Sequence, residues 1–116
     1  MFNFEKLEVW KKAIDFAGFV YTTTRTFPDV ERFGLTNPVR QAAVSISSNI
    51  AEGTSRHSPD DDARVLEIAT GSEVVSQSFI AQRQGHWSEE NRQRIYAAAG
   101  EQSRKLSGLR RSPGVA

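Results

Sequence analysis

The side chains that most often carry catalysis or bind metals are few in this sequence and are not grouped. The chain has no cysteine, which excludes disulfides, thiolate zinc sites, iron–sulfur clusters and cysteine nucleophiles. Its two histidines, His57 and His86, fall in expected loops, and neither has a carboxylate or a second histidine at ligand spacing. The acids Asp60-Asp61-Asp62 do not match a calcium loop, which spaces its oxygen ligands at alternate positions around a glycine. We interpret them as the first turn of a helix, where the helix dipole favours negative charge.

Longer catalytic motifs are missing as well. The sequence contains no HExxH, no phosphate-binding glycine loop and no Glu-x-x-His pair of the kind that holds two iron ions in some four-helix bundles. We therefore expect no enzymatic activity, no cofactor and no metal site.

Charge is distributed unevenly along the second half of the chain. Residues 58–82 carry a net charge of −4 and residues 83–116 a net charge of +4. Mutual neutralisation of neighbouring helices is the simpler interpretation. The alternative is a basic face that binds nucleic acid, because arginine forks suit phosphate oxygens. The candidate residues for such a face are Arg92, Arg94, Arg104, Lys105, Arg110 and Arg111.

The composition is that of a soluble, single-domain protein. The 116 residues have a mass of 12.9 kDa, and 38% are hydrophobic and 25% charged. The net charge of +1 produces no strong overall field. The longest uncharged stretch, Gln41 to Ala51, is shorter than the about 20 residues that a membrane helix needs. Charged residues near the start argue against a signal peptide, so we expect a cytoplasmic protein.

The first helix is expected between Phe4 and Phe27, because Pro28 cannot continue it. It carries two apolar strips about 110° apart. One strip consists of Leu7, Trp10, Ile14, Ala17 and Tyr21, and the other of Val9, Phe16, Val20 and Phe27. An arc this wide predicts burial on two sides, one in the bundle and one against another subunit. The candidate oligomer interface is the second strip, Val9, Phe16, Val20 and Phe27.

Three more helices are expected. Asn37-Pro38 begins one that ends near Gly53, with a stripe formed by Val39, Ala43, Ile46 and Ile50. Ser58-Pro59 begins another that runs to about Gln84, and its apolar pattern changes phase at Gly71-Ser72, which predicts a kink or bulge. Ser88 caps the last helix, whose stripe contains Ile95 and Ala99 and includes the polar Gln102. Short loops between four helices predict an all-α fold, an antiparallel up-down four-helix bundle over residues 1–110 with a flexible tail at 111–116.

Three aromatic side chains have individual interpretations. Trp10 and Trp87 are interpreted as packing anchors. Phe19 falls on the polar arc of the first helix and is a candidate for a contact patch.

Four stretches of the sequence resemble one known family. They are FEKLEVWKKA at residues 4–13, ERFGLT at 31–36, RQAAVSI at 40–46 and SNIAEG at 48–53. These stretches resemble the small four-helix-bundle proteins first noticed as open reading frames in intervening sequences of large-subunit ribosomal RNA genes. The same fold family includes the accessory variability determinant of diversity-generating retroelements. The resemblance covers most of the chain and returns at residues 85–90.

The resemblance implies an up-down bundle that assembles into a ring-shaped homopentamer, with no known activity for most members. The retroelement branch binds RNA and a reverse transcriptase through a basic oligomeric surface. This sequence differs from the family pattern at three places: Ser47 replaces the usual proline, Asp60 to Asp62 replace basic residues, and the region around Gly71 is about two residues shorter.

Two functions follow from these observations. The first is a non-enzymatic, homo-oligomeric helical scaffold that binds RNA or a nucleic-acid enzyme through a basic surface. The alternative is a protein–protein interaction module with no nucleic-acid role. The near-zero net charge favours the second, and the basic last helix and the resemblance favour the first.

Overall fold

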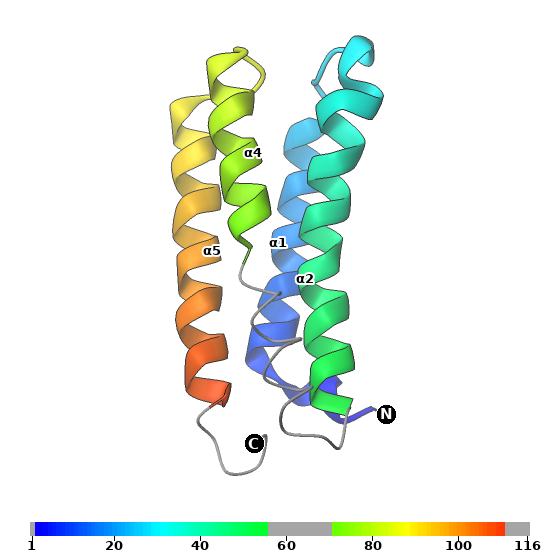
Figure 1. Ribbon diagram of the computed structural model, residues 1–116, viewed down its shortest axis with the longest axis vertical. Coiled ribbons are helices and arrows are strands. Elements are labelled where there is room, and N and C mark those ends of the chain that lie inside the picture. Colours follow the sequence, from blue (N-terminus) through cyan, green and yellow to red (C-terminus); the bar gives the residue numbers. More distant parts are fainter. Residues whose placement is uncertain (1, 56–70, 111–116) are drawn as a thin grey trace.

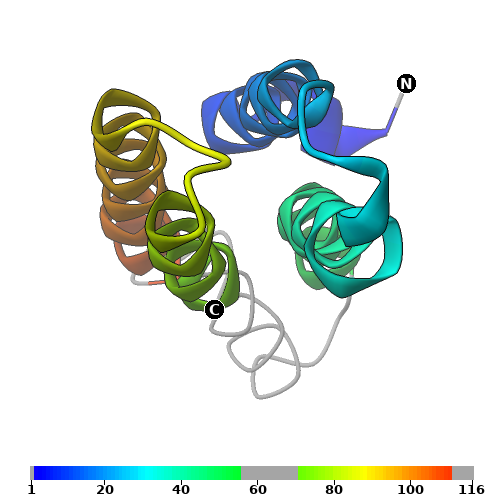
Figure 2. The same ribbon diagram turned by 90° about the horizontal axis from the view of Figure 1, so that it is seen from above.

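The computed structural model describes residues 2–55 and 71–110, and every regular element within these ranges is a helix. In chain order the elements are the 3-10 turn η1 (Asn3–Lys6), α1 (Glu8–Thr24), the 3-10 turn η2 (Asp29–Glu31), the π-helical turn η3 (Arg32–Thr36), α2 (Asn37–Ser55), α4 (Ser72–Arg83) and α5 (Glu89–Arg110). The four α-helices lie side by side as an antiparallel bundle (Figure 1), which confirms the expected all-α bundle. Helix α1 packs against α2 and α5, and α4 packs against α5 and α2 (Figure 2).

The core receives an apolar stripe from each of the four helices. The largest apolar side chains that are fully buried are Val20, Val39, Ile50, Val74 and Ile95. Alanines occupy other core positions and permit close helix–helix approach, namely Ala13, Ala43, Ala81 and Ala99. Both the expected stripe of α2 and the inclusion of Gln102 in the buried stripe of α5 are confirmed.

The first helix is shorter than the expected range of residues 4–27. A 3-10 turn covers Asn3–Lys6, and the extended residue Leu7 separates it from α1. At the other end α1 stops at Thr24, whose hydroxyl donates a 2.7 Å hydrogen bond to the carbonyl one turn earlier. Threonine is a modest helix former, and such back-bonding competes with the regular helical pattern.

The caps of the later helices follow the sequence signals with one difference. Helix α2 begins at Asn37 as expected, but the turn η3 leads directly into it, and Asn37 is already helical with φ −65° and ψ −44°. At α5 the cap is confirmed, because the Ser88 hydroxyl accepts a 3.0 Å hydrogen bond from the backbone N–H of Asn91.

The change of apolar phase at Gly71-Ser72 coincides with the start of a helix. Helix α4 begins at Ser72, and Gly71 before it adopts a left-handed φ of 81°. Gly71 is buried, with room left by the small side chain of Ala99 and the end of Ile46. The expected acidic first turn at Asp60 to Asp62 lies outside the described residues.

Candidate functional site

The apolar strip that we assigned to a subunit interface lies in the core of its own chain. Val9, Phe16, Val20 and Phe27 are between 0 and 7% exposed and belong to one core cluster. The other strip of α1 is the one that reaches solvent, with Ile14 45% and Tyr21 43% exposed. This corrects the assignment of the two strips. Periodicity gives the angle between two apolar strips, but it does not say which of them faces inward.

The exposed strip of α1 joins α2 in an apolar surface, which we call the α1–α2 face and define as Ile14, Tyr21, Arg40 and Val44. The Arg40 guanidinium lies 4.8 Å from the centre of the Tyr21 ring. Its Nε also donates a 2.8 Å hydrogen bond to the Thr24 hydroxyl, which fixes the arginine across the two helices. Val44 follows Arg40 by one turn of α2 and is 38% exposed.

A second apolar surface lies on the other helix pair. We call it the α4–α5 face and define it as Phe79, Arg92 and Tyr96. The Phe79 and Tyr96 rings meet edge to face at 6.4 Å, and the Arg92 guanidinium lies 4.6 Å from the Phe79 ring centre. Phe79 is 44% and Tyr96 57% exposed. Aromatic and arginine side chains of this kind are enriched at protein interfaces.

Arg92 and Arg94, two of the candidate basic residues of the last helix, lie on different flanks of α5. Arg92 lies against Phe79 of α4, whereas Arg94 lies against Phe19 of α1, on the other flank of α5. Lys105 pairs with Glu101 at 3.2 Å. Arg104 is exposed. The side chain of Arg110 and the whole of Arg111 lie outside the described part of the chain.

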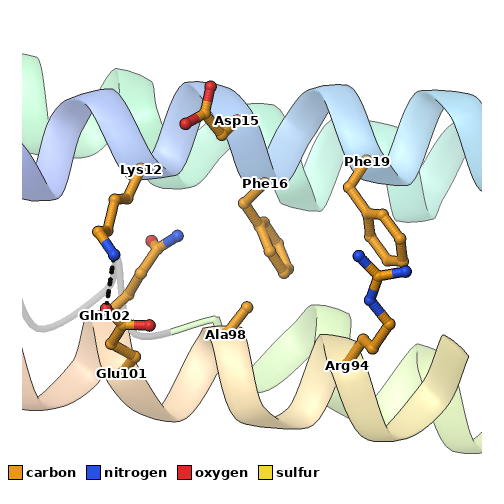
Figure 3. Close-up of a pocket in the computed structure, with 8 residues that line it drawn as sticks. All are labelled: Lys12, Asp15, Phe16, Phe19, Arg94, Ala98, Glu101 and Gln102. Atoms are coloured by element: carbon orange, nitrogen blue, oxygen red, sulfur yellow. Dashed lines mark hydrogen bonds and ion pairs between the residues drawn. The ribbon is translucent and has the colours of Figure 1, made fainter. Parts of the chain in front are cut away.

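Between α1 and α5 lies a groove with a volume of about 290 Å³, which we call the α1–α5 groove (Figure 3). One end is bounded by the ion pair between Lys12 Nζ and Glu101 Oε1, at 2.9 Å. The other end is bounded by Arg94, whose guanidinium lies 4.6 Å from the centre of the Phe19 ring. Phe19, which the sequence placed on a polar arc, is half-buried and forms part of this contact.

The middle of the groove is open because Ala98 is small. Ala98 of α5 lies across from the Phe16 ring, and the Gln102 side chain extends between the helices beside them (Figure 3). Gln102 is 2% exposed, and its Oε1 has no hydrogen-bond partner among the described residues. A buried acceptor without a donor is unfavourable, so this oxygen is a point where a ligand would add a missing interaction.

The ion pair at the end of the groove changes the titration of both partners. The hydrogen bond from Lys12 lowers the pKa of Glu101, and the bond from Lys105 lowers it further. The same bond to Glu101 raises the pKa of Lys12. Both groups therefore stay charged at neutral pH.

A cluster at one end of the bundle joins its two connections. His86 Nε2 lies 2.8 Å from Glu31 Oε2, although the two residues are far apart in sequence. Trp87 is 3% exposed, meets the Phe27 ring edge to face at 5.4 Å and donates from Nε1 to the Thr23 carbonyl at 3.2 Å. Trp87 is thus a packing anchor, as expected. Local spacing could not reveal the partner of His86, because the two loops meet only in the folded bundle.

Within residues 2–55 and 71–110, no three His, Cys, Asp or Glu side chains are grouped closely enough to hold a metal ion. His57 lies outside these ranges. No helix in the described ranges is long and apolar enough to cross a membrane.

Comparison with known proteins adds the family. Residues 5–108 match the model of the family described as 23S rRNA-intervening sequence protein. The chain belongs to this family. A crystal structure of a protein of unknown function from the S23 ribosomal protein family of Bacteroides thetaiotaomicron has the same fold. It superposes with a TM-score of 0.76 at 20% sequence identity, over 90% of this chain and 99% of that one. No curated protein matches this chain.

Membership of the 23S rRNA-intervening sequence protein family confirms the resemblance seen in the sequence. The match spans both halves of the bundle. The family and its solved relative have no assigned activity, so the function is inferred from the two faces and the groove.

Proposed function

We propose that this member of the 23S rRNA-intervening sequence protein family is a non-catalytic helical scaffold that acts by assembling with copies of itself and with a protein partner. The observation that carries the proposal is the presence of two separate apolar faces, one on α1–α2 and one on α4–α5. Contiguous apolar surface on a soluble protein often marks an interaction site. Each face also holds an arginine stacked on an aromatic ring, and such residues dominate the energy of many interfaces.

The two faces differ, which favours a head-to-tail contact. When the α1–α2 face of one copy meets the α4–α5 face of the next, the contact repeats around a ring if the rotation closes. The closed form that we propose is the homopentamer implied by the resemblance. The interface would then use Tyr21 and Tyr96 in place of the core strip that contains Val9 and Phe16.

The arrangement can be tested with one glutamate on each face. Tyr21→Glu should disrupt the first face and Tyr96→Glu the second, because a carboxylate at the centre of an apolar contact has no partner there. Each variant alone should sediment as a monomer. Thr22→Glu and Ala97→Glu are matched controls, since both residues are exposed neighbours on the same helices and lie outside the faces.

Mixing the two disrupted variants distinguishes head-to-tail from symmetric contact. The Tyr21→Glu chain keeps an intact α4–α5 face, and the Tyr96→Glu chain keeps an intact α1–α2 face. An equimolar mixture should therefore form a dimer with one intact contact. A wild-type protein that sediments as a monomer at micromolar concentration would refute self-assembly, and a mixture that stays monomeric would refute the head-to-tail arrangement.

RNA binding is a second candidate, favoured by the family's link with an intervening sequence of 23S rRNA and by the basic residues of α5. Against it, Arg92 and Arg94 point to different flanks and Lys105 is paired. RNA binding through phosphate contacts must weaken as salt rises, because counterions are released. Titration with structured RNA at low and at physiological salt tests this candidate. Binding that is unchanged when Arg104, Lys105, Arg110 and Arg111 become alanine would rule out this surface.

A further inference from the structure

We propose that the α1–α5 groove binds a small aromatic monocarboxylate that also carries a hydrogen-bond donor. This proposal is independent of the assembly proposed above. It rests on the arginine at one end of the groove, the apolar middle and the unpartnered Gln102 acceptor.

Arg94 selects for a carboxylate. Its guanidinium lies over the Phe19 ring, 4.6 Å from the ring centre. None of the ion pairs found among the described residues involves Arg94. Its N–H groups therefore remain available for a bidentate contact with a carboxylate. The carboxylates of Glu101 and Asp15 both line the groove and would repel a doubly charged phosphate, so a single negative charge fits better.

The middle of the groove selects for a flat apolar body. Phe16, Phe19 and Ala98 line it, and the missing bulk at Ala98 leaves space across from the Phe16 ring (Figure 3). The volume of about 290 Å³ is close to the lower end of the range for small-molecule pockets. An aromatic ring would make offset or edge contacts with the phenylalanines here.

Gln102 selects for a donor at the far end. Its amide can turn about its last torsion, which is broad, and present the unpartnered oxygen to a ligand N–H or O–H. Arg94 and Gln102 are eight residues apart on α5, about two helical turns, and both line the groove, so one ligand can contact both. Lys12 does not compete for the ligand's acid group, because it is already paired with Glu101.

Indole-3-acetate is a suitable probe because it combines an acid group, a flat ring and an N–H donor. Binding to the full chain is measured by calorimetry and by ligand-observed NMR. We expect Arg94→Met to weaken binding by about 10- to 100-fold, the effect of losing a hydrogen bond to a charged group. Arg104→Met is the matched control: it removes an exposed arginine of the same helix outside the groove and should leave binding unchanged.

The donor is tested by pairing a ligand change with a protein change. On the wild-type chain, 1-methylindole-3-acetate should bind about 5- to 10-fold more weakly than indole-3-acetate. On Gln102→Met the two probes should bind equally, because the acceptor is gone. Circular dichroism establishes that each variant is folded. If Arg94→Met does not fold, Arg94→Lys, which keeps the charge and loses the fork, should still weaken binding.

Four results would overturn the proposal. The first is no binding of indole-3-acetate at about 10 mM, a concentration at which a specific pocket of this kind should be occupied. The second is equal binding of indole-3-acetate by wild type and by the folded Arg94 variant, and the third is equal binding of the two probes by wild type. The fourth is binding of unsubstituted indole as tight as that of indole-3-acetate.

Discussion

Three glycines allow backbone strain and side-chain contact to be separated by the same substitution. Gly18 lies in the middle of α1, and a Cβ built on it meets no atom within 4 Å. Gly85 has a left-handed φ of 77° and is equally open. Gly71 has a left-handed φ of 81°, and a Cβ there would lie 3.3 Å from Ala99 Cβ and 3.4 Å from Ile46 Cδ1. Replacing each with alanine should therefore change stability by three different amounts.

The magnitudes follow from the local geometry. Gly18→Ala should stabilise the protein by about 0.8–1 kcal/mol, because alanine is the better helix former. Gly85→Ala should destabilise it by about 1 kcal/mol. A Cβ in the left-handed region costs about 1–2 kcal/mol, and the lower conformational entropy of the unfolded chain with alanine offsets part of this cost. Gly71→Ala has the same backbone strain and also brings the new methyl group into tight contact with Ala99 and Ile46. We expect a loss of about 2–3 kcal/mol for it, within the range seen for overpacked cores.

Urea denaturation followed by circular dichroism measures all three, at one fixed protein concentration so that any assembly affects each variant equally. The slope with urea should be the same for the four proteins. A Gly71→Ala variant as stable as Gly85→Ala would show that the core around Ala99 accommodates the extra methyl group. A destabilised Gly18→Ala variant would contradict the open helical surface described for α1.

Three further changes probe other parts of the molecule. Trp87→Phe removes the hydrogen bond to the Thr23 carbonyl and part of a buried ring, and should cost about 1–2 kcal/mol in urea unfolding. Glu101→Gln should reduce the loss of stability on acidification. Because the pKa of Glu101 is lowered in the folded state, its ionised carboxylate stabilises the protein above the unfolded-state pKa, and this stabilisation is lost as the pH falls through the folded-state pKa. Urea unfolding midpoints measured across a range of pH test this. The raised pKa of Lys12 predicts a second contribution to stability, which is lost as the pH rises through the folded-state pKa of Lys12. Glu101→Gln should remove this contribution as well, because Glu101 is the partner of Lys12. Phe33→Ser should leave stability within about 0.5 kcal/mol in thermal unfolding of the dilute protein, because this side chain is 81% exposed.

Local signals predicted the elements of this fold well. The cap at Ser88 is confirmed because capping depends on a few neighbouring residues. Helix α2 starts at Asn37 as expected, but Asn37 is itself helical and is not a cap, because η3 leads directly into α2. The buried stripe of α2 is confirmed because a single narrow stripe has only one way to face the core. The shortened first helix was missed, since its ends depend on weak preferences that tertiary packing overrides.

The features that carry function depend on distant residues, and the sequence did not reveal them. Which strip of α1 faces inward depends on where α2 and α5 pack, so the sequence did not show that Val9 and Phe16 are buried within their own chain. The groove exists because Ala98 meets Phe16 in the register of two helices far apart in the chain. The pairing of His86 with Glu31 likewise joins two loops from opposite halves. Chain periodicity contains none of these distances.

Helix α1 contributes to the core, to the α1–α5 groove and to the α1–α2 face at three different angles around its axis. The two proposals can therefore be tested by separate substitutions. With the core strip as reference, the groove residues Lys12 and Phe19 lie about 70° to one side, toward α5. Ile14 and Tyr21 lie about 130° to the other side, toward α2. A change at Tyr21 therefore alters the assembly surface without touching the groove, and a change at Arg94 alters the groove without touching either apolar face. Tyr21→Glu should bind indole-3-acetate like wild type, and Arg94→Met should sediment like wild type. If one substitution abolished both properties, the ligand and the assembly would share a single site, and the separation of faces on α1 would not describe how the protein works.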